Sequence, residues 1–282
     1  MSHRSTASSS WLSPPPRERL GVYEKSLRVV AFATPSSCGL YRCWMQWMAN
    51  IASADQSMAY DFNVRVQPHG NFTQSSGAER ERLYLMGVKG KIAYVKQVLH
   101  ERSQIAGDGE WILFTDLDVV PLRPLSMLPP LKSNASASGN ANTTIWFMNE
   151  RHEHGGKLGS WTVNSGFYLL RNTLEARRFV KYWHVMLCRN RKLKDQDAAN
   201  FLLNKQMTRS EIAWDTFDES MVTGNVERVD ARTIAYHAIH AQWAADKAVK
   251  LREAFARARA ARGGVELQQT PCDPLAACPG GS

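Results

Sequence analysis

Residues 111–118, Trp-Ile-Leu-Phe-Thr-Asp-Leu-Asp, constrain the fold of this chain more than any other segment. The first five are apolar or favour β structure and predict a buried strand that ends directly in Asp116 and Asp118. Two carboxylates so placed repel each other and resist desolvation, and a divalent cation, which prefers oxygen ligands, relieves both penalties. Because ligands of open α/β sheets bind at the carboxyl ends of strands, the segment predicts a metal and a phosphate-bearing ligand there.

Strands and helices alternate through the first half of the chain. Hydrophobic periodicity predicts strands at residues 27–34, 62–66, 111–115, 143–148, 166–170 and 233–236. It predicts helices at residues 41–52, 78–100, 173–187 and 196–203, with Gly87 and Gly90 as places where the second can break. This order is typical of an α/β sandwich with a mainly parallel sheet.

The two ends of the chain differ in composition from its middle. Residues 1–26 begin with a stretch rich in Ser, Pro and Arg and predict a disordered leader. Residues 27–243 are the expected folded domain, and residues 244–262 predict an Ala-rich basic helix. Residues 263–282 are rich in Gly, Pro and Gln and predict a disordered tail.

Part of the net charge of +9 lies in the basic helix, where six Lys or Arg residues oppose two acids and contribute +4. One interpretation is a surface for an anionic partner. The favoured one is a solvated helix packed weakly on the domain. The chain has no nucleic-acid-binding motif, so no nucleic acid partner is expected.

The compartment is constrained only indirectly. No segment approaches the about 20 apolar residues of a membrane span, so no transmembrane segment is expected, and the N-terminus lacks the apolar core of a signal peptide. N-glycosylation triplets begin at Asn71, Asn134 and Asn142, and each is weak evidence alone. If the chain is lumenal, its targeting segment lies outside this sequence.

The five cysteines show no zinc-binding spacing. In an oxidising compartment Cys38 can pair with Cys43, or Cys272 with Cys278, and an odd count leaves one thiol over. Reduced thiols without a function are the alternative.

Two later motifs place polar groups at element boundaries. Asn164, Ser165 and Gly166 mark a loop-to-strand junction, where glycine permits a tight turn or a close backbone approach. Asp195 and Gln196 open a helix; Asp195 either caps that helix or points, with Gln196, into a cleft.

His237 and His240 follow the last predicted strand. Either histidine can supply a nitrogen to a cation that two acids already hold, although a lone histidine is more often structural. Glycine-rich dinucleotide and P-loop motifs are absent, as is the nucleophile-elbow motif, which excludes those three classes on sequence.

Taken in chain order, these motifs resemble those of GT-A nucleotide-diphospho-sugar glycosyltransferases, notably the eukaryotic family that includes plant cell-wall xylosyl- and arabinosyltransferases. The resemblance covers residues 27–252 and rests on Ala33-Thr34, Lys91, residues 116–124, residues 164–167, Asp195-Gln196 and residues 240–243. It implies a GT-A fold, a single Rossmann-like α/β/α sandwich with a mainly parallel central sheet. The missing membrane anchor and the low-complexity residues 133–144 depart from the family and bear on localisation.

The resemblance implies a Mn²⁺ or Mg²⁺ ion held by Asp118 and His240, with Asp116 contacting either the metal or the ribose. His237 is a competitor for the place of His240. The ion would bridge the diphosphate of a UDP-sugar and stabilise UDP as it leaves. The acceptor would be a glycan or glycoprotein, and the location would be the Golgi lumen.

The resemblance also assigns roles around the donor. Besides Asp116, the expected donor-binding positions are Thr34, Lys91, Leu117, Ser165 and Gly166. The expected catalytic positions are Asn164, Asp195 and Gln196. Family members retain the anomeric configuration and need no general base, so Asp195 is the candidate for the group that attacks or stabilises the reacting carbon.

Two alternative hypotheses also account for Asp116 and Asp118. In a haloacid-dehalogenase-type phosphatase, Asp116 would be the nucleophile and Asp118 the acid/base. That motif normally lies on the first strand, whereas over a hundred residues precede it here, and no paired-acid motif follows. A non-catalytic nucleotide-sugar binder is the third reading, disfavoured because all expected metal ligands are present.

Overall fold

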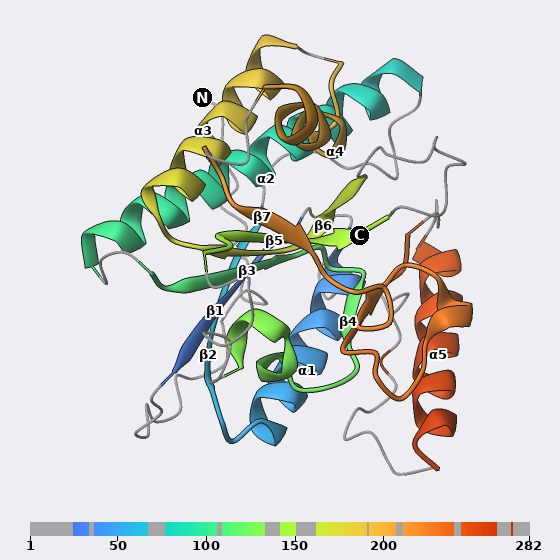
Figure 1. The fold of residues 1–282 in the computed structure, drawn as a ribbon. Coiled ribbons are helices and arrows are strands. Elements are labelled where there is room, and N and C mark those ends of the chain that lie inside the picture. The colour runs from blue at the N-terminus through green and yellow to red at the C-terminus, as the bar shows by residue number, and fades with distance from the viewer. Residues whose placement is uncertain are drawn as a thin grey trace, which may run out of the picture.

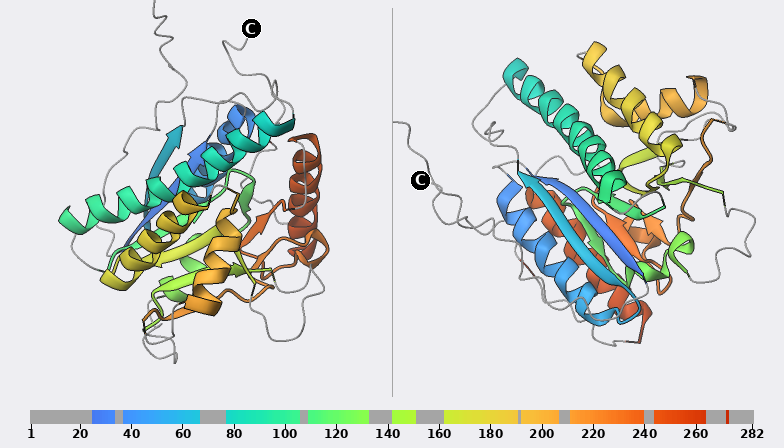
Figure 2. Two further views of the ribbon diagram at one scale, coloured as in Figure 1. Left: turned by 90° about the horizontal axis from the view of Figure 1, so that it is seen from above. Right: turned by 90° about the vertical axis from the view of Figure 1, so that its left-hand side faces the viewer.

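The computed structural model describes residues 25–33, 37–66, 77–105, 109–132, 142–150, 162–190, 192–206, 211–239, 244–263 and 272. Helices cover both faces of a six-stranded sheet with the order β2-β1-β3-β6-β5-β7 (Figures 1 and 2). The strands are β1 (Ser26–Ala33), β2 (Ala59–Val66), β3 (Trp111–Thr115), β5 (Ile145–Asn149), β6 (Val163–Arg171) and β7 (Trp214–Thr216).

The sheet is mainly parallel, as predicted. β1 pairs in parallel with β2 and β3, and β5 pairs in parallel with β7. β6 alone runs the other way, antiparallel to both β3 and β5. The prediction made this strand too short: it spans Val163–Arg171 and is buried at all but its last position, because elements cover both of its faces.

Helices α2 (Gly77–Ile105), α3 (Leu174–Arg189) and α4 (Asp195–Phe201) pack on one face, and α1 (Cys38–Ala54) packs on the other (Figure 1). α4 continues into a π-helical segment, η6 (Leu202–Gln206), and single 3-10 turns lie at η3 (Leu125–Met127), η4 (Pro129–Leu131) and η7 (Val226–Arg228). The predicted inward positions of α1 are buried: Trp44, Trp47, Met48 and Ile51.

The helix α2 is continuous, so the predicted break at Gly87 or Gly90 is wrong. Each glycine costs a helix about 1 kcal/mol relative to alanine. Burial of the apolar face of α2 offsets this cost, and that face comprises Val88, Ile92, Val95, Val98 and Leu99. Among the described residues, no helix combines the length and hydropathy needed to cross a bilayer.

A second, three-stranded sheet joins distant parts of the chain. Its order is β4-β9-β8, formed by β4 (Val119–Pro121), β9 (Ala235–His237) and β8 (Val222–Thr223). Only β9 was anticipated, as a strand at residues 233–236; β4, β7 and β8 have two or three residues each and too little pattern to be predicted. β4 follows directly on Asp118 and pairs antiparallel with β9, which places His237 opposite Val119.

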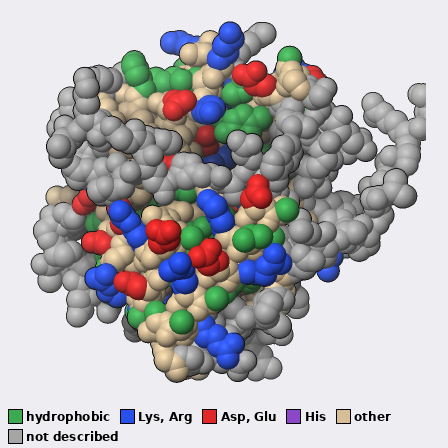
Figure 3. All heavy atoms as spheres, turned by 90° about the vertical axis from the view of Figure 1, so that its right-hand side faces the viewer, with side chains coloured by type: hydrophobic (Ala, Val, Ile, Leu, Met, Phe, Trp, Pro, Cys, Tyr) green, Lys and Arg blue, Asp and Glu red, His purple; other side chains and the backbone are tan. Residues whose placement is uncertain are grey.

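The basic helix α5 (Ala244–Ala261) packs more closely on the domain than predicted. Its inward residues are Ala248, Leu251, Ala254 and Ala258, all buried. The ring of Phe255 lies 5.7 Å from that of Trp47. On the surface over α5, basic and acidic side chains are intermingled (Figure 3), so this face is not a patch of one sign.

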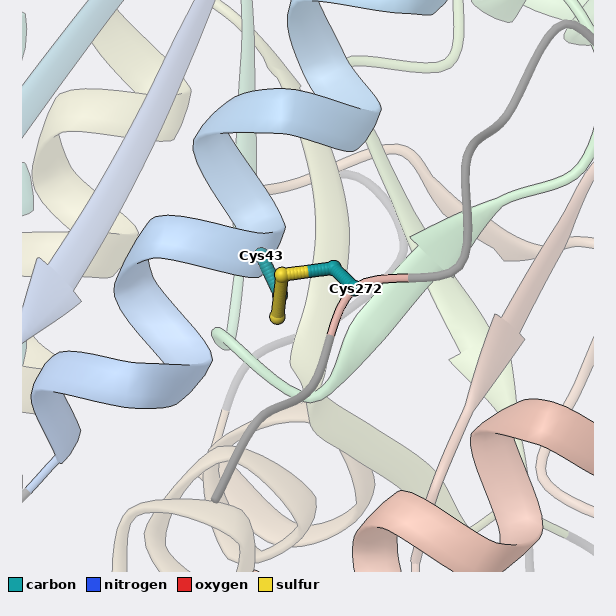
Figure 4. Close-up of a disulfide and its surroundings, with 2 residues drawn as sticks. All are labelled: Cys43 and Cys272. Carbon is teal, nitrogen blue, oxygen red and sulfur yellow. A yellow bond between two sulfur atoms is a disulfide. The ribbon is translucent and has the colours of Figure 1, made fainter. Parts of the chain in front are cut away.

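A disulfide joins Cys43 in α1 to Cys272 (Figure 4), with Cα atoms 5.4 Å apart and a sequence separation of 229. Neither predicted local pair forms. Each of those pairs would need a cysteine that the Cys43–Cys272 bond already uses. The bond fixes one residue of the predicted tail, residues 263–282, to the core side of α1, where Cys43 is 0% exposed.

We expect Cys272→Ser to lower the free energy of unfolding by about 2–5 kcal/mol, because a cross-link between distant residues restricts the unfolded chain. Urea denaturation with and without reductant measures this. The wild type should lose stability on reduction, whereas the variant should be insensitive to reductant. Cys188→Ser is the control, since Cys188 is exposed and not disulfide-bonded. Equal midpoints for oxidised and reduced wild type would contradict the prediction.

Candidate functional site

A cleft of about 800 Å³ opens at the carboxyl end of β3, where the sequence predicted a ligand. Its walls come from α2, the turn between β3 and β4, β6, α4, β9 and α5. The ionisable groups that line it are Lys91, Asp116, Asp118, Glu150, Lys194, Asp195, Asp197, His237 and Lys247.

Asp116, Asp118 and His237 form a cluster whose ligand-capable atoms all lie within 4.8 Å of one another. The pairing of β4 with β9 makes this cluster, and the Ala238 amide donates a hydrogen bond to the Asp118 carbonyl at 3.0 Å. The structure therefore brings His237, the competitor for the third position, to the two acids. His240, the predicted ligand, lies outside the described residues.

The cluster fits a divalent cation. Two carboxylates and one imidazole are a donor set suited to Mn²⁺ or Mg²⁺. Asp118 and His237 are buried and Asp116 is half-buried, so water compensates their polarity poorly. The buried Nδ1 of His237 has no hydrogen-bond partner among the described residues. Buried polar atoms are normally paired, so a bound ligand or ion would satisfy this nitrogen.

Gly166 makes room for the cluster. A Cβ atom at this position would lie 2.2 Å from Cε1 of His237 and 2.7 Å from Oδ2 of Asp116, closer than real Cβ contacts allow. The Gly166 carbonyl accepts a hydrogen bond from the Asp116 amide, and its own amide donates to Oδ1 of Asn164, both at 2.7 Å. Asn164 therefore holds the backbone beside the acids as well as lining the cleft.

Lys91 bridges two carboxylates from different elements. Its Nζ lies 3.0 Å from Oδ1 of Asp116 and 2.8 Å from Oδ2 of Asp195. Burial alone would lower the pKa of Lys91, but the charges of Asp116 and Asp195 outweigh it and raise the pKa above its ordinary value. Lys91 therefore stays cationic at neutral pH and ties α2 to the end of β3 and to α4.

Lys247 reaches the site from α5, with Nζ 2.6 Å from Oδ2 of Asp118. The other oxygen, Oδ1, lies 3.2 Å from Nε2 of His237. Burial alone would raise the pKa of Asp118, but Lys247 and His237 outweigh it, and the pKa falls well below its usual range. Asp118 is therefore ionised at neutral pH, with an ammonium group beside it.

Asp195 and Gln196 begin α4. Asp195 is the first helical residue, and no side-chain cap precedes it, so the capping interpretation is wrong: its carboxylate pairs with Lys91 instead. The Gln196 amide donates to a carboxylate oxygen of Glu150. The sequence analysis missed Glu150. It follows directly on the end of β5, just as Asp116 follows directly on the end of β3, and this position after a strand is the signal that would have identified it.

The structure brings together most of the predicted site residues. Those that line the cleft are Lys91, Asp116, Leu117, Asp118, Asn164, Ser165, Gly166, Asp195 and Gln196. Thr34 lies outside the described residues, as His240 does. Lys247 was noted only as one base of a helix, because nothing local marks it as a partner of Asp118.

The family follows from comparison with known proteins. Residues 100–253, just over half of the chain, match the model of the nucleotide-diphospho-sugar transferase family. The chain belongs to this family and is therefore a glycosyltransferase, which leaves the phosphatase reading without support. No curated protein matches the chain at a significant level.

Several solved glycosyltransferase structures are similar to this chain, and the first of them reaches a TM-score that supports a shared fold. A glycosyltransferase involved in the glycosylation of the major capsid of PBCV-1 is 12% identical, with 80% of this chain and 99% of that chain covered and a TM-score of 0.50. The galactosyltransferase LgtC, with donor and acceptor sugar analogues, is 15% identical (84% and 100% covered, TM-score 0.46). Mouse xyloside xylosyltransferase 1 is 12% identical (76% and 98% covered, TM-score 0.45). The predicted GT-A fold is confirmed.

We expect Gly166→Ala to weaken Mn²⁺ binding at least about tenfold and to cost about 1–3 kcal/mol of stability, because the added methyl group displaces His237 or Asp116. Calorimetric titration of Mn²⁺ and urea denaturation measure the two effects. Gly224→Ala is the matched control, since its methyl would lie 2.2 Å from Cδ1 of Ile239 instead. Mn²⁺ binding by Gly166→Ala at wild-type strength would contradict the prediction.

We expect Lys247→Met to bind Mn²⁺ about tenfold more tightly than the wild type without nucleotide, because the ammonium group next to Asp118 competes with a cation. Electron paramagnetic resonance of free Mn²⁺ measures the affinity. The same change at the exposed Arg259 of α5 removes an equal charge away from the cleft and should leave the affinity unchanged. Weaker Mn²⁺ binding by Lys247→Met than by the wild type would show that the Lys247 ammonium group does not compete with the cation for Asp118.

Proposed function

We propose that this glycosyltransferase moves a sugar from a UDP-sugar to a glycan or glycoprotein, requires Mn²⁺ or Mg²⁺, and retains the anomeric configuration. The observation that carries the proposal is the convergence of Asp116, Asp118 and His237 in one cleft. Its volume of about 800 Å³ lies in the range of small-molecule sites. The family supplies the nucleotide-sugar donor, and the donor set of the cluster supports the metal.

Asp116, Asp118 and His237 would hold the cation. When bound, the cation supplies Lewis-acid stabilisation of a departing diphosphate. Lys247 lies on the same side of the cleft and adds a positive charge that favours phosphate. Ser165 and Gly166 line the cleft beside these groups, and we assign them to contacts with the donor.

Asp195 is our candidate for the carboxylate that acts on the reacting carbon. Glycosyl transfer develops positive charge on that carbon, and a fixed negative group stabilises it. Lys91 holds the Asp195 carboxylate from one side, and Gln196, held by Glu150, is its neighbour in the cleft. We therefore assign Asp195 to stabilisation or attack, and Gln196 and Asn164 to contacts with the donor sugar.

A lumenal location, such as the Golgi, is part of the proposal. The Cys43–Cys272 disulfide is typical of oxidising compartments. Asn142, which begins one of the glycosylation triplets, is exposed and so accessible to modification. The motif order supports a place near the plant xylosyl- and arabinosyltransferases within the family.

Calorimetric titration of UDP tests the proposal. With Mn²⁺, UDP should bind the wild type; EDTA or Asp118→Ala should weaken binding at least about 100-fold, because Asp118 would hold the cation that stabilises the bound diphosphate. Asp197→Ala is the matched control, an exposed acid that lines the cleft but lies outside the metal cluster. UDP binding that is indifferent to EDTA would overturn the metal-dependent site. Binding without UDP release from any UDP-sugar would favour the non-catalytic binder.

A further inference from the structure

Tyr84 is a large aromatic residue that lines the cleft and is exposed. Its side chain is 45% exposed. Six other large hydrophobic side chains in the described part of the chain are similarly exposed, and none of them lines the cleft: Met86, Ile105, Leu174, Tyr182, Phe201 and Val249. Tyr84 makes no hydrogen bond or ring–ring contact with any described residue. An exposed aromatic ring thus lines the cleft without a second described ring beside it.

The helix α2 sets the position of the ring relative to the catalytic groups. Tyr84, Gly87, Val88 and Lys91 line the cleft at the spacing of one helix face. At 1.5 Å per residue, Tyr84 lies about 10 Å along the axis from Lys91. Exposure rises along this face, from 7% at Lys91 to 45% at Tyr84, so the ring lies towards the mouth of the cleft.

The course of α2 agrees with this placement. Because α2 connects the parallel strands β2 and β3, it runs antiparallel to them, and its N-terminal half lies at the carboxyl edge of the sheet (Figure 1). Lys91 binds Asp195, which faces the reacting carbon in the proposed function. A group further out on the same helix face therefore lies between Lys91 and the mouth of the cleft.

The chemistry of the ring suits a saccharide. A pyranose has an apolar face of C–H groups and an edge of hydroxyls, and tyrosine matches it with a flat ring and one polar tip. Desolvation and the nearby charge of Asp195 raise the pKa of Tyr84 to about 12, so its hydroxyl stays protonated and can donate a hydrogen bond. Lys194, Gln196 and Asp197 line the cleft as well and offer further polar groups.

We propose that Tyr84 is an acceptor-binding residue, whose ring stacks on a sugar ring of a saccharide acceptor at the mouth of the cleft. The inference rests on the proposed function and extends it by placing the acceptor along the N-terminal half of α2. The diphosphate end of the donor is assigned elsewhere, to the cluster of Asp116, Asp118 and His237. Tyr84 therefore contributes to acceptor affinity and little to UDP affinity.

Saturation-transfer NMR titrations with methyl β-D-xylopyranoside, methyl β-D-galactopyranoside and methyl β-D-glucopyranoside, in the presence of UDP and Mg²⁺, test the assignment. Tyr84→Ala should weaken binding of the recognised glycoside about tenfold, which corresponds to about 1.4 kcal/mol, while Tyr84→Phe retains most of the affinity. Tyr182→Ala is the matched control, because Tyr182 is 52% exposed on α3 and does not line the cleft. UDP affinity, measured separately, should be the same in all four proteins.

Three other outcomes would overturn the acceptor assignment, and a fourth would overturn the proposed function. If Tyr84→Ala binds the glycoside as well as Tyr182→Ala does, or if no glycoside binds the UDP-loaded wild type, the acceptor assignment is overturned. If Tyr84→Ala instead loses UDP affinity, the ring stacks on the donor base, which also overturns it. If UDP fails to bind the wild type at all, the proposed function itself fails, and this result is distinct from the others.

Discussion

Asp116 and Asp118 leave a buried strand with two like charges close together, and each neighbouring element compensates for them. Lys91 comes from α2, His237 from β9 and Lys247 from α5, all within 4.0 Å of a carboxylate oxygen. An uncompensated buried charge costs several kcal/mol, so these elements cannot pack independently of one another. The interaction that stabilises the fold at this edge of the sheet is thus the one that shapes the ligand site.

The two lysines compensate in different ways. Lys91 is buried, lies between Asp116 and Asp195, and keeps two elements at a fixed separation. Lys247, in the first turn of α5, has a side chain that is 26% exposed and pairs with Asp118. Opening the buried bridge of Lys91 leaves charges away from water and is costly, whereas the more exposed Lys247 can exchange its carboxylate partner for water at lower cost. Lys91 is therefore suited to a permanent role and Lys247 to one that changes when a ligand arrives.

Sequence predicts those parts of the site whose signal is local. β3 and its two acids are contiguous, so hydrophobic pattern and chemistry coincide in one short segment. The choice between His237 and His240 depends on how β4 pairs with β9, two strands of three residues each from distant parts of the chain. Lys247 depends on how α5 docks. The pairing of β4 with β9 and the docking of α5 are decided by long-range packing rather than by local propensity. Neither therefore produces a periodic pattern in the sequence.

The antiparallel pairing of β4 with β9 also limits how this chain can vary in length. Side chains alternate along a strand, so a shift of β9 by one residue would turn His237 away from Asp118 and present a neighbour in its place. A residue gained or lost within β9 therefore removes a candidate ligand even if every side chain is retained. Changes in the segment between β8 and β9 are absorbed as long as Val119 still faces His237. Among relatives, the spacing from Asp118 to the histidine is free to differ, while the position of the histidine at the end of its strand is not.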